Sequence, residues 1–267
     1  MPIINSVIAG GGTTPTGTLS ITNNGTYDVT NYANADVNVP VDAVPNWYVW
    51  RVNDGGVLKV SSSKTGQTTF STSPATDVGF GCFAYVFAGR TGLGGIPVDC
   101  SSLTSVTGQS AFDHAFYNCG NTPSFDFSNL KTINAMYAFQ YAFSLNITSA
   151  LPSTMSFPAL ESINGTLAFQ YAWESNSKVT RIEMPKLTNV GNGALTLAFA
   201  NSSIDTVVLG GTQAITFGTL SPLNLMFSGC SQNITVYAPA ASQATIEAMS
   251  DYPSFGGYGT VTWVWQS

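Results

Sequence analysis

The sequence predicts an α/β solenoid, in which each repeat holds a short helix and a short parallel strand, preceded by a small β-rich N-terminal segment. Three observations lead to this prediction. Aromatic residues return at intervals of 26 to 30 residues, helix-like apolar spacing surrounds each of them, and period-two alternation follows. A unit of this length cannot cover its own apolar face, so stacked units must bury one continuous core.

The first repeating element is expected to be a short helix. Its aromatic anchors are Phe87, Phe116, Phe143, Trp173, Phe199 and Phe227. Phe or Leu stands four residues before each anchor, and Val, Ala or Met stands directly before it. Apolar positions at i, i+3 and i+4 share one face of an α-helix. We therefore expect about two helical turns in each unit, held by packing because they are too short to be stable alone.

The second repeating element is expected to be a short strand followed by a Leu-x-x-Ile turn. Strict alternation indicates a strand with one buried face. The inward pairs are Val98 and Cys100, Phe125 and Phe127, Met155 and Phe157, Ile182 and Met184, Val207 and Leu209, and Ile234 and Val236. The turn leucines are Leu103, Leu130, Leu160 and Leu187, each with Val or Ile three residues later. The strands should pair in parallel on one side, with the helices on the other.

The pattern divides the chain into four parts. Residues 1–45 form a flexible arm (1–14) and a β-hairpin around Asn24-Gly25, residues 46–79 a β cap, residues 80–238 a solenoid of about six repeats, and residues 239–267 a C-terminal cap. In the hairpin, Leu19 and Ile21 precede the turn and Tyr27 and Val29 follow it. The C-terminal cap should contain a helix near Ala240–Met249 and a final strand through Trp263.

Composition limits the function classes. Charged residues are only 8% of the chain, against roughly 25% in an average soluble domain. The net charge is −6, and the eight Lys and Arg residues form no cluster that could neutralise phosphates or anionic lipid. No apolar run reaches the roughly 18 to 20 residues of a membrane span. We therefore expect a neutral surface rich in Ser, Thr and Asn, with no nucleic-acid partner and no membrane insertion.

Known catalytic and metal-binding motifs do not appear. His114 is the only histidine, next to Asp113 within a repeat, and a solvated or structural role is favoured. HExxH, Walker A and nucleophile-elbow patterns are missing, so we expect no catalytic residue, no metal and no cofactor. The cysteines Cys82, Cys100, Cys119 and Cys230 form no CxxC pair, which favours buried free thiols over disulfides.

One candidate site remains, on the outward face of the predicted strands. Asp99, Asp126 and Glu183 occupy equivalent positions in successive units, where the other units carry Ser156, Val208 and Thr235, and Arg181 lies in the adjacent row. Neighbouring parallel strands lie about 5 Å apart, which would suit a carboxylate pair for glycoside hydrolysis. A solvated sheet face is the simplest interpretation, a recognition surface or calcium contact the second, and catalysis the third. The possible binding face is Asp99, Asp126, Ser156, Arg181 and Glu183.

A second, weaker candidate lies before the repeats. Trp47, Tyr48 and Trp50 are close enough in sequence to stack on sugars. Aromatic residues that cover the open end of the solenoid are the favoured interpretation, because a repeat array needs a terminal cap.

The repeat wording resembles that of BspA-like leucine-rich repeats, in which phrases of the form AF.NC..L..I..P.L..I recur. The matching text here is AFDHAFYNCGNTPSFDFSNLKTI, AFQYAFSLNITSALPSTMSFPALESI and AFQYAWESNSKVTRIEMPKLTNV. The tail NITVYAPAASQATIEAMSDYP is similar to the ending of such arrays. The resemblance covers about residues 80–253. It implies a leucine-rich-repeat array and says little about function.

The wording I..NGTYDVT.YA.ADVNV is similar to a short module of phage tail and fibre proteins and of some surface proteins of gut bacteria. This resemblance spans about 25 residues. It implies a non-enzymatic phage structural protein on the virion surface, such as a tail fibre, receptor-binding protein, head fibre or decoration protein. The N-terminal segment would bind other virion proteins, and the repeats would adhere to a glycan or protein on a host or mucosal surface. Fibres are often trimers, so a homo-oligomer is expected.

Three other functions fit the same residues. A bacterial cell-surface adhesin would have a signal peptide and an anchor, and the first basic residue here is Arg51. A virion protein released by lysis needs neither. A glycan-active enzyme would use the acidic residues of the strand face. A purely architectural protein would attach to the virion and bind nothing outside it.

Overall fold

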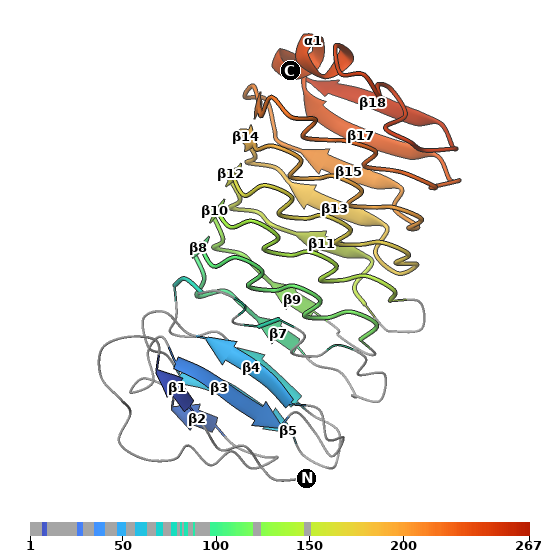
Figure 1. Cartoon of the computed structure of the whole chain (residues 1–267). Helices are drawn as coiled ribbons and strands as arrows, with labels where there is room; N and C mark the ends of the chain where they lie inside the picture. The colour runs from blue at the N-terminus through green and yellow to red at the C-terminus, as the bar shows by residue number, and fades with distance from the viewer. Residues whose placement is uncertain are drawn as a thin grey trace.

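The computed structural model describes residues 7–9, 26–28, 35–40, 47–51, 57–62, 68–71, 76–78, 81, 83–84, 88, 97–119, 124–146 and 151–267. The chain is a parallel β-solenoid of about six turns, whose coils stack one on another (Figure 1). The predicted solenoid is thus confirmed. Leu19 and Ile21 of the predicted hairpin, the first aromatic anchor Phe87, the side chains of Trp47, Tyr48 and Trp50, and Cys82 lie outside the described residues.

One side of the solenoid is a ladder of parallel strands, one from each coil and a last one from the C-terminal cap, as predicted. The strands are β7 (Pro97–Asp99), β9 (Ser124–Asp126), β11 (Thr154–Ser156), β13 (Arg181–Met184), β15 (Thr206–Leu209), β17 (Ile234–Pro239) and β18 (Val261–Gln266). They belong to two five-stranded sheets: β7 and β9 are part of one, and β11-β13-β15-β17-β18 form the other. The predicted inward residues are buried, except Phe125, which is partly buried.

A second ladder runs along one edge of the solenoid. It consists of two-residue parallel strands: β8 (Ser105–Val106), β10 (Thr132–Ile133), β12 (Ser162–Ile163), β14 (Asn189–Val190) and β16 (Thr216–Phe217). The Leu-x-x-Ile segments therefore end in strands. Their leucines and their Val or Ile residues, from Leu103 to Val190, are fully buried.

The third side overturns the prediction of one helix per repeat. The segments 109–118, 136–145, 166–175, 192–201 and 220–229 are successive turns. In each segment, every fourth residue has a positive φ, as at Ser110, His114 and Asn118 in the first one. Among the described residues, α1 (Gln243–Glu247) is the only α-helix, and it follows the short 3₁₀ helix η2 (Ala240–Ser242) in the C-terminal cap.

The hydrogen bonds explain why these segments are not helical. The amide of Phe139 donates to the Ala168 carbonyl of the next coil (2.7 Å), whereas the amide of Ala142 donates back to Phe139 (3.1 Å). Amides thus alternate between a neighbouring coil and a residue three positions earlier, and none needs the i−4 carbonyl of a helix. Hydrogen bonds between stacked coils thus satisfy backbone groups that would otherwise bond within a helix.

The apolar pattern also fits these turns better than a helix. The Ala-Phe pairs that begin at Ala111 and Ala115, and those that begin at Ala138 and Ala142, are four residues apart. A helix turns about 100° per residue, so a period of four drifts by roughly 40° at each step. In the turns it does not drift, because each four-residue unit repeats the same backbone conformation. Glycine occupies two of the left-handed positions, at Gly193 (φ +59°) and Gly229 (φ +77°), where it avoids the cost of a side chain.

Two columns of stacked side chains form the spine of the core. Phe116, Phe143, Trp173, Phe199 and Phe227 stack in order with ring centroids 5.2–5.8 Å apart. A second column contains Phe83, Phe112, Phe139 and Phe169, with spacings of 4.8–5.2 Å. Such ring pairs contribute about 0.5–1.5 kcal/mol each beyond the area that they bury. The recurring aromatic anchors therefore identified the core correctly although their backbone is not helical.

The register of the last repeat differs from the prediction by two residues. Thr206 pairs with Thr235, and Val208 pairs with Tyr237. Tyr237, not Thr235, therefore continues the outward row of Glu183 and Val208. Ile234, Val236 and Ala238 are all buried, so alternation alone allows either register. The strand-to-strand hydrogen bonds decide between them.

The N-terminal strands form two groups, of which one continues the strand ladder of the solenoid and the other is a separate sheet. β1 (Val7–Ala9), β3 (Ala35–Pro40) and β4 (Trp47–Arg51) form an antiparallel sheet, and Val7–Ala9 belongs to the arm that was expected to be flexible. β2 (Thr26–Asp28) and β6 (Thr68–Ser71) flank β5 (Val57–Ser62), and β6 pairs in parallel with β7. The free edge of the first repeat strand is therefore paired. The expected final strand is confirmed as β18, beside β17.

Candidate functional site

The predicted strand face is divided between the two sheets. Asp99 lies directly opposite Asp126 across β7 and β9, and Ser156 lies opposite Glu183 across β11 and β13. Arg181 begins β13, one row away from Glu183. The ladder is interrupted between β9 and β11, so Asp126 and Ser156 are not strand partners. The five residues thus form two groups and not one continuous row.

The charged groups of the strand face have local structural partners. Asp99 Oδ1 accepts hydrogen bonds from the amide (3.0 Å) and hydroxyl (2.6 Å) of Ser101, and Asp126 Oδ1 accepts one from the amide of Ser128 (2.9 Å). An aspartate that bonds the backbone two residues on stabilises a turn. Arg181 Nε lies 2.7 Å from Glu183 Oε1, an exposed ion pair that contributes roughly 0–1 kcal/mol. These contacts favour a solvated, turn-stabilising face, and its role in binding stays a prediction.

The turn side presents a second surface, which we call the turn face: the outward residues of the segments 109–118, 136–145, 166–175, 192–201 and 220–229. Its first three segments carry the aromatic column, defined as His114, Tyr141 and Tyr171, whereas the last two segments have Leu197 and Leu225 at this position. His114 and Tyr141 have ring centroids 4.7 Å apart and Tyr141 and Tyr171 4.8 Å, both pairs stacked. All three occupy the middle left-handed position of their segments. Identical backbone geometry therefore places the rings one above another.

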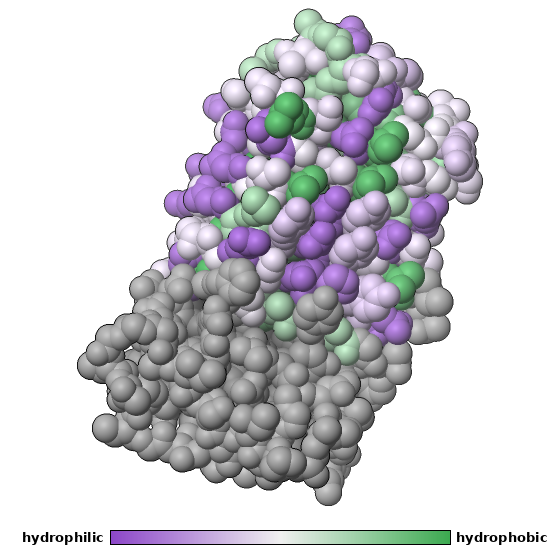
Figure 2. All heavy atoms as spheres, in the orientation of Figure 1, coloured by the Kyte–Doolittle hydropathy of each residue, from purple (hydrophilic) through white to green (hydrophobic). Residues whose placement is uncertain are grey.

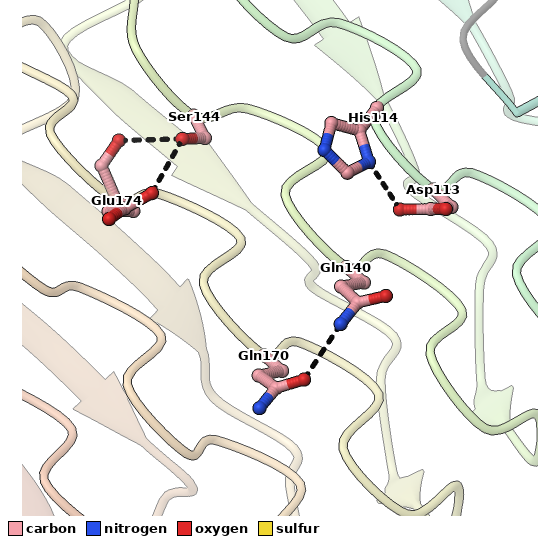
Figure 3. Close-up of polar contacts among 6 residues, drawn as sticks. All are labelled: Asp113, His114, Gln140, Ser144, Gln170 and Glu174. Carbon is pink, nitrogen blue, oxygen red and sulfur yellow. Dashed lines mark hydrogen bonds and ion pairs between the residues drawn. The ribbon is translucent and has the colours of Figure 1, made fainter.

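Polar side chains that neighbour the aromatic column in sequence form pairs across the coils (Figure 3). Gln140 Nε2 donates to Gln170 Oε1 (2.7 Å), and Ser144 Oγ donates to the carbonyl oxygen (3.0 Å) and carboxylate (3.4 Å) of Glu174. Each pair joins neighbouring coils. The side chains of Gln140, Gln170 and Glu174 remain partly exposed, whereas Ser144 is buried. Amide and carboxylate groups are thus fixed beside the rings and have hydrogen-bonding capacity left.

His114 belongs to this surface. Its Nδ1 lies 2.6 Å from Asp113 Oδ1, and the two side chains are 21% and 18% exposed. The imidazole is held by Asp113 (Figure 3) and stacks on the Tyr141 ring. These contacts fit the structural role that was favoured from the sequence.

Tyr141 keeps its proton at neutral pH. Burial, and then the negative charge of Glu174, raise the pKa of the Tyr141 hydroxyl above its ordinary value of 10.0. The hydroxyl therefore can both donate and accept a hydrogen bond. Tyr141 stacks between His114 and Tyr171, so both faces of its ring are covered, and its side chain stays partly exposed. Such a surface suits a ligand with many hydroxyl or amide groups.

Sequence reasoning missed this surface although a signal was present. The tripeptide Gln-Tyr-Ala occurs twice, at 140–142 and 170–172, and Asp-His-Ala stands at the equivalent position 113–115. Polar and aromatic residues thus repeat between the buried pairs. A helical interpretation distributes them over the outer face of each helix and does not predict that they stack.

Further features of the described residues are consistent with a polar, weakly charged exterior. Figure 2 shows hydrophilic residues spread over the visible face, with hydrophobic ones in small separate groups. Within the described part of the chain, no group of three His, Cys, Asp or Glu side chains could hold a metal ion, and no helix is long and apolar enough to cross a membrane. Cys100, Cys119 and Cys230 are buried, and burial raises the pKa of the Cys230 thiol.

Comparison with known protein families and with curated proteins gives no match for this chain.

Proposed function

We propose that this chain is a non-enzymatic adhesion protein of a virion, with the N-terminal segment attached to the particle and the solenoid displayed outward. The observation that carries the adhesive role is the turn face, where hydroxyl, amide and aromatic groups repeat over its first three segments. The location on a virion is supported by the sequence of residues 21–39, which is similar to a module of phage fibre proteins. The relation to BspA-like leucine-rich repeats is likewise proposed on the repeat wording.

The shape of the molecule suits display. The N-terminal strands and the C-terminal cap lie at opposite ends of the stack (Figure 1). Attachment through the N-terminal end would leave the turn face accessible along its length. Individually weak contacts become strong when many copies act together, because the later contacts are intramolecular. A homo-oligomeric fibre, with three chains as the simplest case, would supply such copies.

The ligand that fits best is a hydroxyl-rich glycan of a host or mucosal surface. Its hydroxyls match the outward groups at Gln140, Gln170 and Tyr141, and neither partner needs a strong charge. A host-surface protein is the alternative. A bacterial adhesin with the same face is the second candidate function, favoured by the similarity of the N-terminal wording to surface proteins of gut bacteria.

Multivalent display on beads tests the adhesive role. Beads coated with the full chain should be retained on mucin or on bacterial host cells. The double variant Tyr141→Phe/Tyr171→Phe removes two hydroxyls and keeps the stack. It should lower retention at least about tenfold, since each hydrogen bond contributes roughly 1 kcal/mol. The matched control, Thr154→Val/Thr206→Val, removes two hydroxyls from the strand face and should leave retention unchanged.

Two outcomes would contradict the proposal. Equal losses for both double variants would mean that the turn face is not the adhesive surface, and no retention of the wild type on any tested surface would favour an architectural protein. Proteomics of purified particles separates a virion protein from a bacterial adhesin. If polysaccharide were cleaved and Asp126→Asn or Glu183→Gln abolished the cleavage, the chain would be an enzyme.

A further inference from the structure

We propose that a pocket at the C-terminal end of the solenoid binds a single neutral sugar ring. The pocket has a volume of about 260 Å³ and lies between residues 217–224, which lead from β16 into the last turn segment, and the cap, at 245–255. This inference goes beyond adhesion along the turn face and does not depend on it. The site would give the protein a discrete binding position in addition to a repetitive surface.

The inner walls of the pocket are apolar and firmly supported. Phe217, Leu223, Met249 and Phe255 contribute to them. Leu223 and Phe255 are fully packed in the core, whereas Phe217 and Met249 are partly buried against it. The Phe227 amide donates to the Phe255 carbonyl (2.9 Å), which fixes the cap segment to the last coil. The pocket is therefore formed before any ligand arrives.

The remaining lining is mostly polar and carries a single charge. Asn224 offers an amide, Thr245 a hydroxyl and Asp251 a carboxylate, and no lining residue is basic. Among the described residues, the Asp251 carboxylate accepts a single long hydrogen bond, from Ser250 Oγ (3.4 Å), and retains capacity for further donors. A negatively charged ligand would meet this carboxylate without a compensating cation. A ligand that donates hydroxyl hydrogens would form charge-assisted hydrogen bonds with it.

These features together match a neutral pyranose. Binding sites for small molecules combine apolar walls with a few convergent polar groups. A sugar ring has apolar C–H faces and a rim of hydroxyls, which correspond to the two kinds of lining. An apolar cavity of roughly 150 Å³ accommodates benzene, so this pocket has room for a six-membered ring with substituents.

The surroundings of the pocket also point to a ligand. Leu220 and Leu225 are 67% and 39% exposed and belong to the segment that forms one wall. They are two of the five large hydrophobic side chains that are exposed among the described residues. Exposed apolar groups beside a pocket are typical of a recognition site. The site lies at the end opposite the N-terminal strands, where an attached protein would meet its target first (Figure 1).

Ligand-observed NMR on the full chain provides the test. The probes are the methyl glycosides of glucose, galactose, mannose and N-acetylglucosamine, with sialic acid as the anionic comparison. We expect saturable binding of at least one neutral glycoside in the millimolar range and none of sialic acid. Asp251→Asn should weaken that binding about tenfold, since hydrogen bonds to charged groups are the stronger ones. Thr245→Trp should abolish it by filling the pocket.

The matched control is Ala244→Trp, because Ala244 is exposed on the same helix and does not line the pocket. It should bind like the wild type, and equal melting temperatures would show that all variants fold. Absence of saturable binding by the wild type, or binding that survives Thr245→Trp, overturns the inference. Since the bead assay uses turn-face variants, retention that persists in Thr245→Trp leaves the proposed adhesion intact while this inference fails.

Discussion

The strand side and the turn side of this solenoid bury the same kind of core through different backbones. The strand side uses extended residues whose outward carboxylates, such as Asp99 and Asp126, stabilise the turns that follow them. The turn side uses a left-handed residue at every fourth position, and its outward groups stack and bond from coil to coil. The turn side is therefore better suited to present a repeated surface, whereas the outward polar groups of the strand side mostly serve local structure.

The comparison also shows how stacking changes the meaning of a sequence pattern. A segment such as Ala111–Cys119 would have to form its own hydrogen bonds in an isolated helix. Here four of its nine amides donate to carbonyl groups of the next coil, as the Phe112 amide does to the Ala138 carbonyl (2.7 Å). A backbone conformation that is unfavourable in isolation becomes stable because each coil forms hydrogen bonds with its neighbour.

The largest expected effect concerns whether both sides belong to one core. Phe143 on the turn side and Phe157 on the strand side are both fully buried. We expect Phe143→Ala and Phe157→Ala each to lower the free energy of unfolding by about 3–5 kcal/mol. Chemical denaturation measures both values. A loss below about 1 kcal/mol for Phe143→Ala alone would show that the turn side is not part of the core.

A smaller effect tests the structural role of the strand-face carboxylates. Asp126→Ala removes the acceptor of the Ser128 amide and should destabilise the protein by about 1 kcal/mol. Asp126→Asn keeps an oxygen in the same place and should lose less. The measurement is again denaturant unfolding. If both variants matched the wild type, the turn-stabilising role of this row would be refuted.

The left-handed positions distinguish turns from helices. Ser110 has φ +55°, a left-handed conformation that costs a residue with a side chain roughly 1–2 kcal/mol. The free energy of unfolding of Ser110→Gly should therefore equal that of the wild type or exceed it by up to about 1 kcal/mol. The neighbouring Gln109 is exposed and does not share this backbone, so Gln109→Gly should destabilise modestly. Melting temperatures compare the two. Destabilisation by both glycines would agree with a helix instead.

The smallest effect is a pH dependence of the aromatic column. Because burial and then Glu174 raise the pKa of Tyr141, the folded protein holds this proton more tightly than the unfolded chain. The resulting stability is fully present below pH 10 and is lost as pH rises through the raised folded pKa. Between pH 9 and 11, the free energy of unfolding should therefore decrease less steeply with pH for Tyr141→Phe than for the wild type. An identical decrease in both proteins would contradict the burial of Tyr141.

Much of the fold follows from the sequence, and the exceptions have physical causes. The aromatic anchors and the leucines such as Leu130 and Leu160 predicted the coils and the core, since spacing reports what stacks. The helix prediction failed because the acceptors of Phe139 and Phe143 lie about 30 residues away, in the next coil. The position of Asp126 was predicted, but its hydrogen bond to the Ser128 amide was not. The aromatic column was missed because stacking depends on backbone angles that residue types do not specify.

The most direct test of the central claim is the detection of scalar couplings across the backbone hydrogen bonds of the turn segments by NMR. We expect couplings from the Phe139 amide to the Ala168 carbonyl carbon and from the Phe169 amide to that of Ala194. A helical repeat would instead couple Phe139 to Ala135 and Phe169 to Gly165. Couplings to the next coil would establish the stacked turns and their common core. Couplings four residues back would contradict both.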